Sequence, residues 1–227
     1  MKRFVPLVLS GLLLAGCAST VQNGTGSDNE SIEQSTESSF AQAVEQGMST
    51  EEPPEFLSDE NKELFKRAEY IYYNAFVCSG FNFTIDDSRK TTDFEGSSDY
   101  GYAYETDYDY SELEDYVEYV FTGDALEQIN GGLSSYVKDS SGKLCWIDAA
   151  RGTDIFYNDK TFELVSESND KIEFKAVANY SWKEMYATEE EFKESGTEGD
   201  YEWTEEYNFE LTKTDDGWRV SHFEYWK

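Results

Sequence analysis

Histidine, cysteine and basic side chains are scarce in this sequence. Among 227 residues there are one histidine and three cysteines, and 18 lysines and arginines against 48 acids give a formal net charge of −30. A polyanion is repelled by nucleic acid and by anionic lipid headgroups, so we expect neither as a ligand. The charge favours basic proteins or cations as partners, although acidic surfaces also serve simply to keep an exported protein soluble.

The single histidine, His222, gives little support for catalysis. It stands in the last predicted strand, where a lone histidine is far more often a surface side chain than a catalytic base. Neither Cys78 nor Cys145 has the flanking base or glycine-rich turn of a nucleophile. Gly131 and Gly132 lack the Lys-Ser/Thr continuation of a phosphate-binding loop. We therefore expect a protein that is not an enzyme and that uses no cofactor.

Several acids match part of the spacing of a calcium-binding loop. With one serine, they are Asp107, Asp109, Ser111, Asp115 and Glu118. That loop needs glycine at its sixth position for a sharp turn, and Glu112 stands there. Chance matches are common in so acidic a chain, so we expect no metal site. No local motif singles out a pair of carboxylates for glycoside hydrolysis either.

The first 17 residues resemble the signal of a bacterial lipoprotein. Lys2 and Arg3 precede an apolar run, residues 4–14, that is too short to span a bilayer as a mature helix. The letters LAGC, ending at Cys17, resemble a lipobox; the alternative is an ordinary signal peptide that contains a cysteine. We predict that residues 1–16 are cleaved and that Cys17 becomes the lipidated first residue, with palmitate-like chains as anchor. Each buried CH₂ group of such a chain contributes about 0.8 kcal/mol to membrane binding.

Cleavage leaves a more acidic protein outside the cytoplasm, held to the cell membrane by its lipid alone. Residues 1–16 carry two positive charges and no negative ones, so the mature net charge is −30 − 2 = −32. Residues 17–57 contain no lysine or arginine and are rich in small polar residues and glutamate. Such a segment buries too little apolar surface to offset its ordering entropy, so we predict a disordered acidic tether. Its only apolar patch, residues 40–44, is expected to form no more than a transient helical turn.

Residues 58–227 are long enough for one domain with a substantial core. Ser58 is the expected cap of a first helix that ends near Gly80, and shorter helices follow from residues 111 and 124. Alternating apolar residues predict strands at 81–85, 98–110, 135–138, 144–148, 162–166, 172–182, 201–211 and 218–225. A change of parity between Val220 and Phe223 suggests a bulge, and residues 189–200 resemble an acidic loop. Helices followed by a mostly meander antiparallel sheet indicate an α+β fold.

The stretch 98–121 combines a strand pattern with a helix pattern. Its tyrosines stand at even positions, which puts them on one face of an extended strand: Tyr100, Tyr102, Tyr104, Tyr108 and Tyr110. From Ser111 the apolar residues follow helical spacing, and Ser111 with Glu114 forms a capping box.

The strand half of this stretch is the candidate binding surface. If its even face is core, only Glu105, Asp107 and Asp109 face a partner. If the segment is exposed, the tyrosines themselves form the contact surface, since tyrosine is enriched at binding hot spots. We predict the second arrangement, with Tyr100, Tyr102, Tyr104, Asp107, Tyr108 and Asp109 as partner-binding residues.

Cys78 and Cys145 are the only cysteines left after Cys17. In an exported domain they either pair as a disulfide or remain two buried thiols. Because nothing in the sequence fixes their separation, both alternatives stay open.

Residues 113–146 and the C-terminal run together resemble a known family. An amphipathic helix leads to Ser135-Tyr136-Val137, then a tight turn, Gly142-Lys143-Leu144, Arg151-Gly152 and a closing Asp216-Gly217-Trp218-Arg219-Val220. Over roughly residues 60–227 this pattern is similar to the IseA-type DL-endopeptidase inhibitor family of cell-envelope proteins. The lipobox, the tether and the Tyr/Asp insertion at 93–110 depart from that family, and no inhibitory residue can be carried over from it.

The resemblance implies a compact α+β fold with two lobes and no enzymatic activity. It also implies that a loop between the lobes blocks the active-site cleft of cysteine peptidases that cut peptidoglycan stem peptides. We therefore expect a membrane-tethered inhibitor of a basic cell-wall endopeptidase.

Two other classes of function remain open. One is a small-ligand-binding or enzymatic domain on a nuclear-transport-factor-like cone fold. It needs a pocket lined by Trp182, Trp203 and Tyr207 with an acid at its base, although these aromatics also fit ordinary core packing. The other is a structural lipoprotein with no defined partner.

Overall fold

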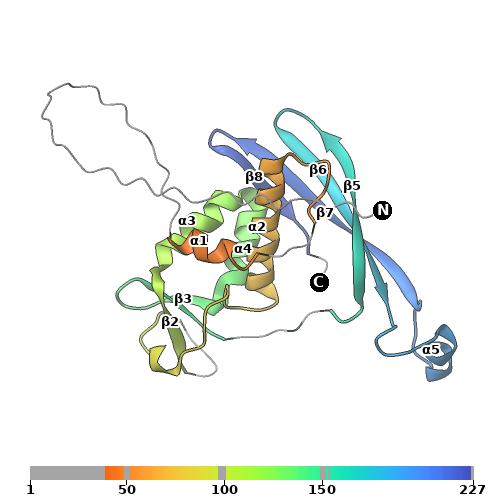
Figure 1. Ribbon diagram of the computed structural model, residues 1–227, viewed down its shortest axis with the longest axis horizontal. Helices are drawn as coiled ribbons and strands as arrows, with labels where there is room; N and C mark the ends of the chain where they lie inside the picture. Colours follow the sequence, from red (N-terminus) through yellow and green to blue (C-terminus); the bar gives the residue numbers. More distant parts are fainter. Residues whose placement is uncertain (1–38, 49–51, 97–100, 149–151, 153, 226–227) are drawn as a thin grey trace, which may run out of the picture. The chain divides into compact units, whose positions relative to one another are not determined.

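The computed structural model describes residues 39–48, 52–96, 101–148, 152 and 154–225 (Figure 1). The predicted signal peptide, Cys17 and Tyr100 lie outside these residues. No helix in the described ranges has the length and apolar character needed to cross a membrane. Helices α1 to α4 precede the larger sheet, and the strands of the described residues form two four-stranded antiparallel sheets, which confirms the α+β class.

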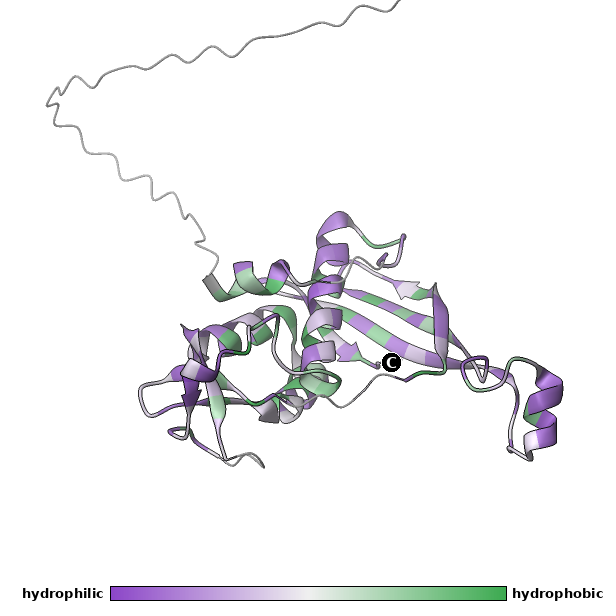
Figure 2. Ribbon diagram, turned by 60° about the horizontal axis from the view of Figure 1, so that its bottom comes forward, coloured by the Kyte–Doolittle hydropathy of each residue, from purple (hydrophilic) through white to green (hydrophobic). Residues whose placement is uncertain are grey.

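The larger sheet is a meander, as predicted. Its strands are β5 (Tyr157–Glu167), β6 (Lys171–Ser181), β7 (Glu202–Thr214) and β8 (Gly217–Phe223), in the order β5-β6-β7-β8. Figure 2 shows hydrophobic and hydrophilic residues alternating along these strands, the pattern of a sheet with one buried face. The predicted bulge is present, because Glu210 pairs with His222 while Leu211 pairs with Val220.

The smaller sheet has the order β1-β2-β4-β3. Its strands are β1 (Lys90–Thr91), β2 (Ala103–Asp109), β3 (Tyr136–Lys138) and β4 (Lys143–Trp146). The predicted turn between β3 and β4 is present, and the Asp139 carboxylate accepts hydrogen bonds from the backbone of Ser141 and Lys143, each at 2.8 Å. Because β1 pairs only with Ala103 and Tyr104, it leaves the rest of that β2 edge uncovered.

Three helices occupy the predicted places with shifted ends, and two others, α1 and α5, were not predicted. The helices are α1 (Ser39–Glu45), α2 (Asp59–Phe76), α3 (Tyr110–Val120), α4 (Gly123–Gly132) and α5 (Glu189–Ser195), with single 3₁₀ turns η1 (Asp87–Arg89) and η2 (Leu133–Ser135). Ser58 caps α2 as expected, accepting a hydrogen bond from the backbone N–H of Asn61 at 3.3 Å. The helix ends at Phe76, before Gly80. The capping box of α3 is Asp109 with Glu112, two residues earlier than predicted.

Phenylalanine rings join α2 to the larger sheet. Phe65 of α2 lies 5.5–5.7 Å, centroid to centroid, from four rings of the sheet: Phe162, Phe174, Phe209 and Phe223. The same core cluster includes Tyr104, Leu144 and Trp146 of the smaller sheet. Burial of such a ring contributes about 1.5–3 kcal/mol, so one shared core stabilises helices and both sheets together.

The folded part begins earlier than residue 58, so the predicted tether is wrong for the residues of α1, whereas residues 17–38 of that tether lie outside the described residues. Phe40 and Val44 of α1 are fully buried, and Phe40 lies within 5.8 Å of the rings of Phe81, Tyr108 and Tyr116. Two apolar side chains one turn apart are enough to hold this short helix, because aromatic rings from other parts of the chain surround them. We call these rings the aromatic socket; the polar composition of the segment does not reveal it.

Residues 81–85 form a tight turn, and the predicted strand is wrong. Phe81 has φ 40° and Asn82 has φ 64°, both in the left-handed region that a strand excludes. The backbone N–H of Gly80 donates to the Tyr136 hydroxyl at 2.7 Å, and that of Phe81 donates to the Asn74 side chain at 2.8 Å. These bonds from the core hold a conformation that costs a non-glycine residue about 1–3 kcal/mol.

Candidate functional site

The tyrosines of β2 face the core, so the prediction that they form an exposed surface is wrong. Tyr104 is only 6% exposed, and its ring lies 5.4 Å from that of Trp146. Tyr102 and Tyr108 are half-buried and pack against the same core. The alternation was predicted correctly, but the side of the strand that is buried depends on β4 and on helices far away in the sequence.

The acids of β2 occupy the exposed face, which was the other alternative. Glu105, Asp107 and Asp109 are all exposed. Asp107 accepts a hydrogen bond from Arg89 at 2.6 Å, and Asp109 forms an ion pair with Lys143 at 2.8 Å. The hydrogen bond and charge of Arg89 hold the pKa of Asp107 below its ordinary value, so Asp107 stays ionised at a lower pH than a free aspartate.

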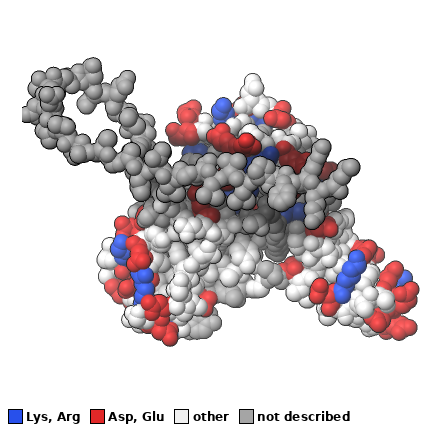
Figure 3. Space-filling model, in the orientation of Figure 1, with Lys and Arg blue, Asp and Glu red and all other residues white. Residues whose placement is uncertain are grey.

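A second acidic feature, which sequence analysis treated as a plain loop, projects from the larger sheet. We call residues 182–202, which connect β6 to β7 and include α5, the acidic tip. They carry eight acids and two lysines, a net charge of −6. Figure 1 shows α5 beyond the ends of β6 and β7, and Figure 3 shows acidic side chains gathered around it.

An aromatic cluster orders the acidic tip. Phe192 of α5 is buried, and its ring lies 5.7–5.8 Å from the rings of Trp182, Tyr186 and Tyr201. The Tyr201 hydroxyl donates to the backbone carbonyl of Tyr186 at 2.9 Å. The tip therefore has a small core of its own, which limits the entropy that it loses on binding a partner.

The helix in the tip could have been predicted from its caps. Thr188 and Glu191 match the S/T-x-x-E capping box, and the Thr188 hydroxyl accepts a hydrogen bond from the Glu191 backbone at 3.2 Å. Gly196 ends the helix with φ 75°, the left-handed conformation that glycine adopts without strain. Because the segment contains so many acids, the capping box and the terminating glycine were both overlooked and the segment was predicted as a loop.

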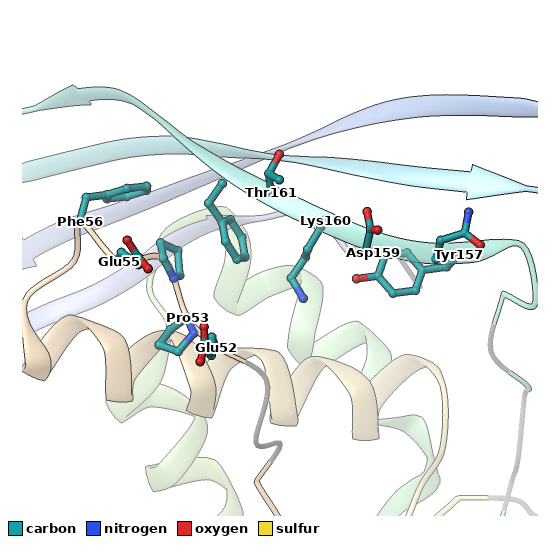
Figure 4. A pocket seen from close by; sticks show the side chains of 11 residues that line it. Glu52, Pro53, Glu55, Phe56, Tyr157, Asp159, Lys160 and Thr161 are labelled. Carbon is teal, nitrogen blue, oxygen red and sulfur yellow. The ribbon is translucent and has the colours of Figure 1, made fainter.

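A groove of about 630 Å³ lies between β5 and the segment that leads into α2 (Figure 4). Pro53, Phe56 and Phe162 are among its lining residues. Figure 4 shows Lys160 pointing from β5 toward the helix below, and its ammonium group lies 3.9 Å from the carboxylate of Glu69 on α2. Both side chains are more than nine-tenths buried, so this ion pair is an internal contact between helix and sheet.

Of the three aromatics proposed for the alternative ligand pocket, the two tryptophans pack against each other and Tyr207 packs beside the main core. Trp182 and Trp203 have ring centroids 6.3 Å apart, and the Tyr207 hydroxyl donates to Glu205 at 2.7 Å. Glu205 is exposed, so it is not a buried acid at the base of a pocket. These contacts fit the packing interpretation of Trp182, Trp203 and Tyr207.

Cys78 and Cys145 are free thiols, so the disulfide alternative is wrong for this structure. Cys145 shares a separate small cluster with Ala103 and Ile147, on the side of β4 opposite Leu144 and Trp146. Its burial raises the pKa of its thiol to about 11, which makes it a poor nucleophile.

The remaining candidate positions show no catalytic arrangement. His222 lies 3.6 Å from the carboxylate of Glu224 on the surface. The calcium-loop spacing falls across β2 and α3, because α3 already begins at Tyr110. Within the described residues there is no group of three or more acids, histidines and cysteines that could hold a metal ion. Comparison of this chain with protein families and with curated proteins finds no match.

Proposed function

We propose that this protein is a membrane-tethered inhibitor that binds a basic, cell-wall-cutting cysteine endopeptidase and blocks its active-site cleft. The observation that carries the proposal is the acidic tip, an ordered projection with a net charge of −6. Opposite charge steers association and fixes the orientation of two proteins, and its effect is strongest at low salt. A projection with its own core can fill a cleft without first having to fold.

The rest of the surface supports the same partner. Glu105, Asp107 and Asp109 add exposed acids on the smaller sheet, and the mature chain is expected to carry −32. Lipid attachment at Cys17, which remains a prediction, would keep the inhibitor next to the wall in which such peptidases act.

Inhibition can be tested directly. Purified protein is titrated into a digest of peptidoglycan by the DL-endopeptidases of the same organism, and release of stem-peptide fragments is followed. Complete inhibition at micromolar protein is expected. An unchanged digestion rate at that concentration, with the protein folded by circular dichroism, contradicts the proposal.

A small-ligand-binding function is the second candidate, favoured by the groove beside Lys160. Its volume of about 630 Å³ falls within the range of about 300–1,000 Å³ that ligand sites occupy. A thermal-shift screen with neutral amino acids, sugars and nucleotides tests this candidate separately from the first, because a ligand of the groove raises the melting temperature in the absence of a peptidase.

A further inference from the structure

A second, smaller hollow lies where the β1–β2 ladder ends. We call it the β2-edge pocket; its volume is about 280 Å³, and its lining includes Phe83, Arg89, Glu105, Asp107, Tyr108 and Trp146. One wall is the segment 82–89 that leads into β1, and the other is the part of β2 that β1 does not cover. It therefore contains two of the predicted partner-binding residues, Asp107 and Tyr108.

Three aromatic rings contribute to the lining of this pocket. Phe83 stacks on Tyr108 with centroids 5.9 Å apart, and it lies 6.1 Å from Trp146. The turn that carries Phe83 is fixed from the core by Asn74 and Tyr136, so these walls are formed before any ligand arrives. The faces of such rings attract cations.

Charged groups make the pocket negative. Asp86, Glu105 and Asp107 line it together with one cation, Arg89, which leaves a net charge of −2 from three acids against one arginine. Arg89 is held by Asp107 at 2.6 Å, and Asp86 accepts hydrogen bonds from the backbone and hydroxyl of Ser88 at 2.9 and 2.7 Å. Glu105 is exposed and forms no ion pair within the described part of the chain. The excess of carboxylates would repel an anionic ligand, whereas a bound cation would reduce the net negative charge of the pocket.

A lysine ammonium group already lies against tyrosine rings at the N-terminal end of β2. The ammonium group of Lys90 lies 4.5 Å from the ring centroid of Tyr102 and 5.8 Å from that of Tyr104. A cation entering the β2-edge pocket would find the same combination of tyrosine ring and carboxylate a few residues along β2.

We propose that the β2-edge pocket receives an arginine or lysine side chain of the protein partner. The aromatic rings contact the flat guanidinium or the ammonium group, and Glu105 supplies the carboxylate that pairs with it. This inference rests on the proposed function, since it names a second contact point for the same basic partner, on a different sheet from the acidic tip.

Titration with single amino-acid derivatives tests the pocket without any peptidase. The ¹⁵N-labelled full-length protein is titrated with N-acetyl-arginine amide, N-acetyl-lysine amide and, as a neutral isostere, N-acetyl-citrulline amide. The Trp146 indole signal, identified by its loss in Trp146→Phe, and the Asn82 side-chain amide are followed. Saturable shifts with a millimolar Kd are expected for the cations and not for citrulline. Equal shifts with citrulline, or none with either cation up to 50-fold excess over the expected Kd of about 1 mM, overturn the proposal.

Two variants and a control locate the binding. Glu105→Gln is expected to weaken arginine binding about threefold, the effect of one partly exposed ion pair, and Phe83→Leu is expected to abolish it. Glu190→Gln on the acidic tip removes the same charge elsewhere and should leave the titration unchanged. Unchanged affinity in both pocket variants contradicts the assignment. The titration needs no peptidase, so a negative titration and a negative inhibition assay are separate results. The first contradicts the pocket assignment, and the second contradicts the proposed function.

Discussion

Several exposed acids of this protein form ion pairs with neighbouring basic side chains, and each such pair is weak. The Asp107 carboxylate is 82% exposed and is held by Arg89 across the β2-edge pocket, while the neighbouring tyrosines are turned inward. Exposed pairs of this kind contribute little to stability. Their consequence is electrostatic instead, because a paired acid remains ionised at lower pH than a free one.

The pKa of Asp107 reports this pairing. Its folded-state pKa is depressed, chiefly by the hydrogen bond from Arg89, so any stability from the pair is present above the unfolded pKa and lost as pH falls through the folded pKa. Arg89→Gln should therefore raise the pKa of Asp107 toward its ordinary value, as measured by NMR titration of the carboxyl carbon. An unchanged pKa of Asp107 in this variant contradicts the hydrogen bond between Arg89 and Asp107.

Whole elements differ in how far the sequence alone predicts them. The strands β6, β7 and β8 were predicted because one apolar face runs through each of them, and period two is unambiguous over eleven residues such as those of β6. The helix α1 was missed because its anchors, Phe40 and Val44, stand in a polar segment and their socket comes from distant residues. The acidic tip was predicted as a loop, although its helix carries recognisable caps. For β2 the alternation was visible, but the buried side of the strand depends on tertiary packing.

The docking of α1 can be tested by removing its anchor. Phe40→Ala should lower the free energy of unfolding by about 3–5 kcal/mol, because it empties an aromatic socket, and it should increase amide exchange throughout α1. Gln42→Ala, on the exposed side of the same helix, is the matched control and should change stability by less than about 0.5 kcal/mol. If both substitutions have equal, small effects on the free energy of unfolding in urea denaturation, α1 is not packed on the domain and belongs to the disordered tether.

The acidic tip should behave as a unit that can unfold locally. Phe192→Ala removes the centre of its aromatic cluster, so amides of residues 182–202 should lose protection from hydrogen exchange while those of β6 beside Phe174 keep theirs. Glu190→Ala, exposed on the same helix, should leave exchange unchanged. Loss of protection across the whole sheet in Phe192→Ala would show that the tip is part of the main core.

At the scale of the whole molecule, the acidic tip and the acids of β2 share one property, which is their negative charge. The acids on the tip and those on β2 belong to two different sheets that share one core, and we expect both groups of acids to attract the same basic partner. Attraction between these acids and a distant basic partner weakens as salt is added, since the Debye length falls from about 10 Å at 0.1 M to about 3 Å at 1 M. The account therefore requires inhibition that depends steeply on ionic strength and on the acids of the tip.

The most direct measurement compares three proteins as inhibitors of the same endopeptidase at 0.05 and 0.5 M salt. They are the wild type, a tip variant (Glu190→Gln, Glu194→Gln, Glu198→Gln) and a control variant (Glu167→Gln, Asp215→Asn, Asp216→Asn) that removes three exposed acids from the turns at the other end of the sheet. We expect the tip variant to inhibit at least about tenfold less well at low salt, a loss of about 1.4 kcal/mol in binding, and to lose most of the salt dependence. The control should match the wild type. Equal inhibition by the tip variant and the control would contradict the central claim that the acidic tip binds the peptidase.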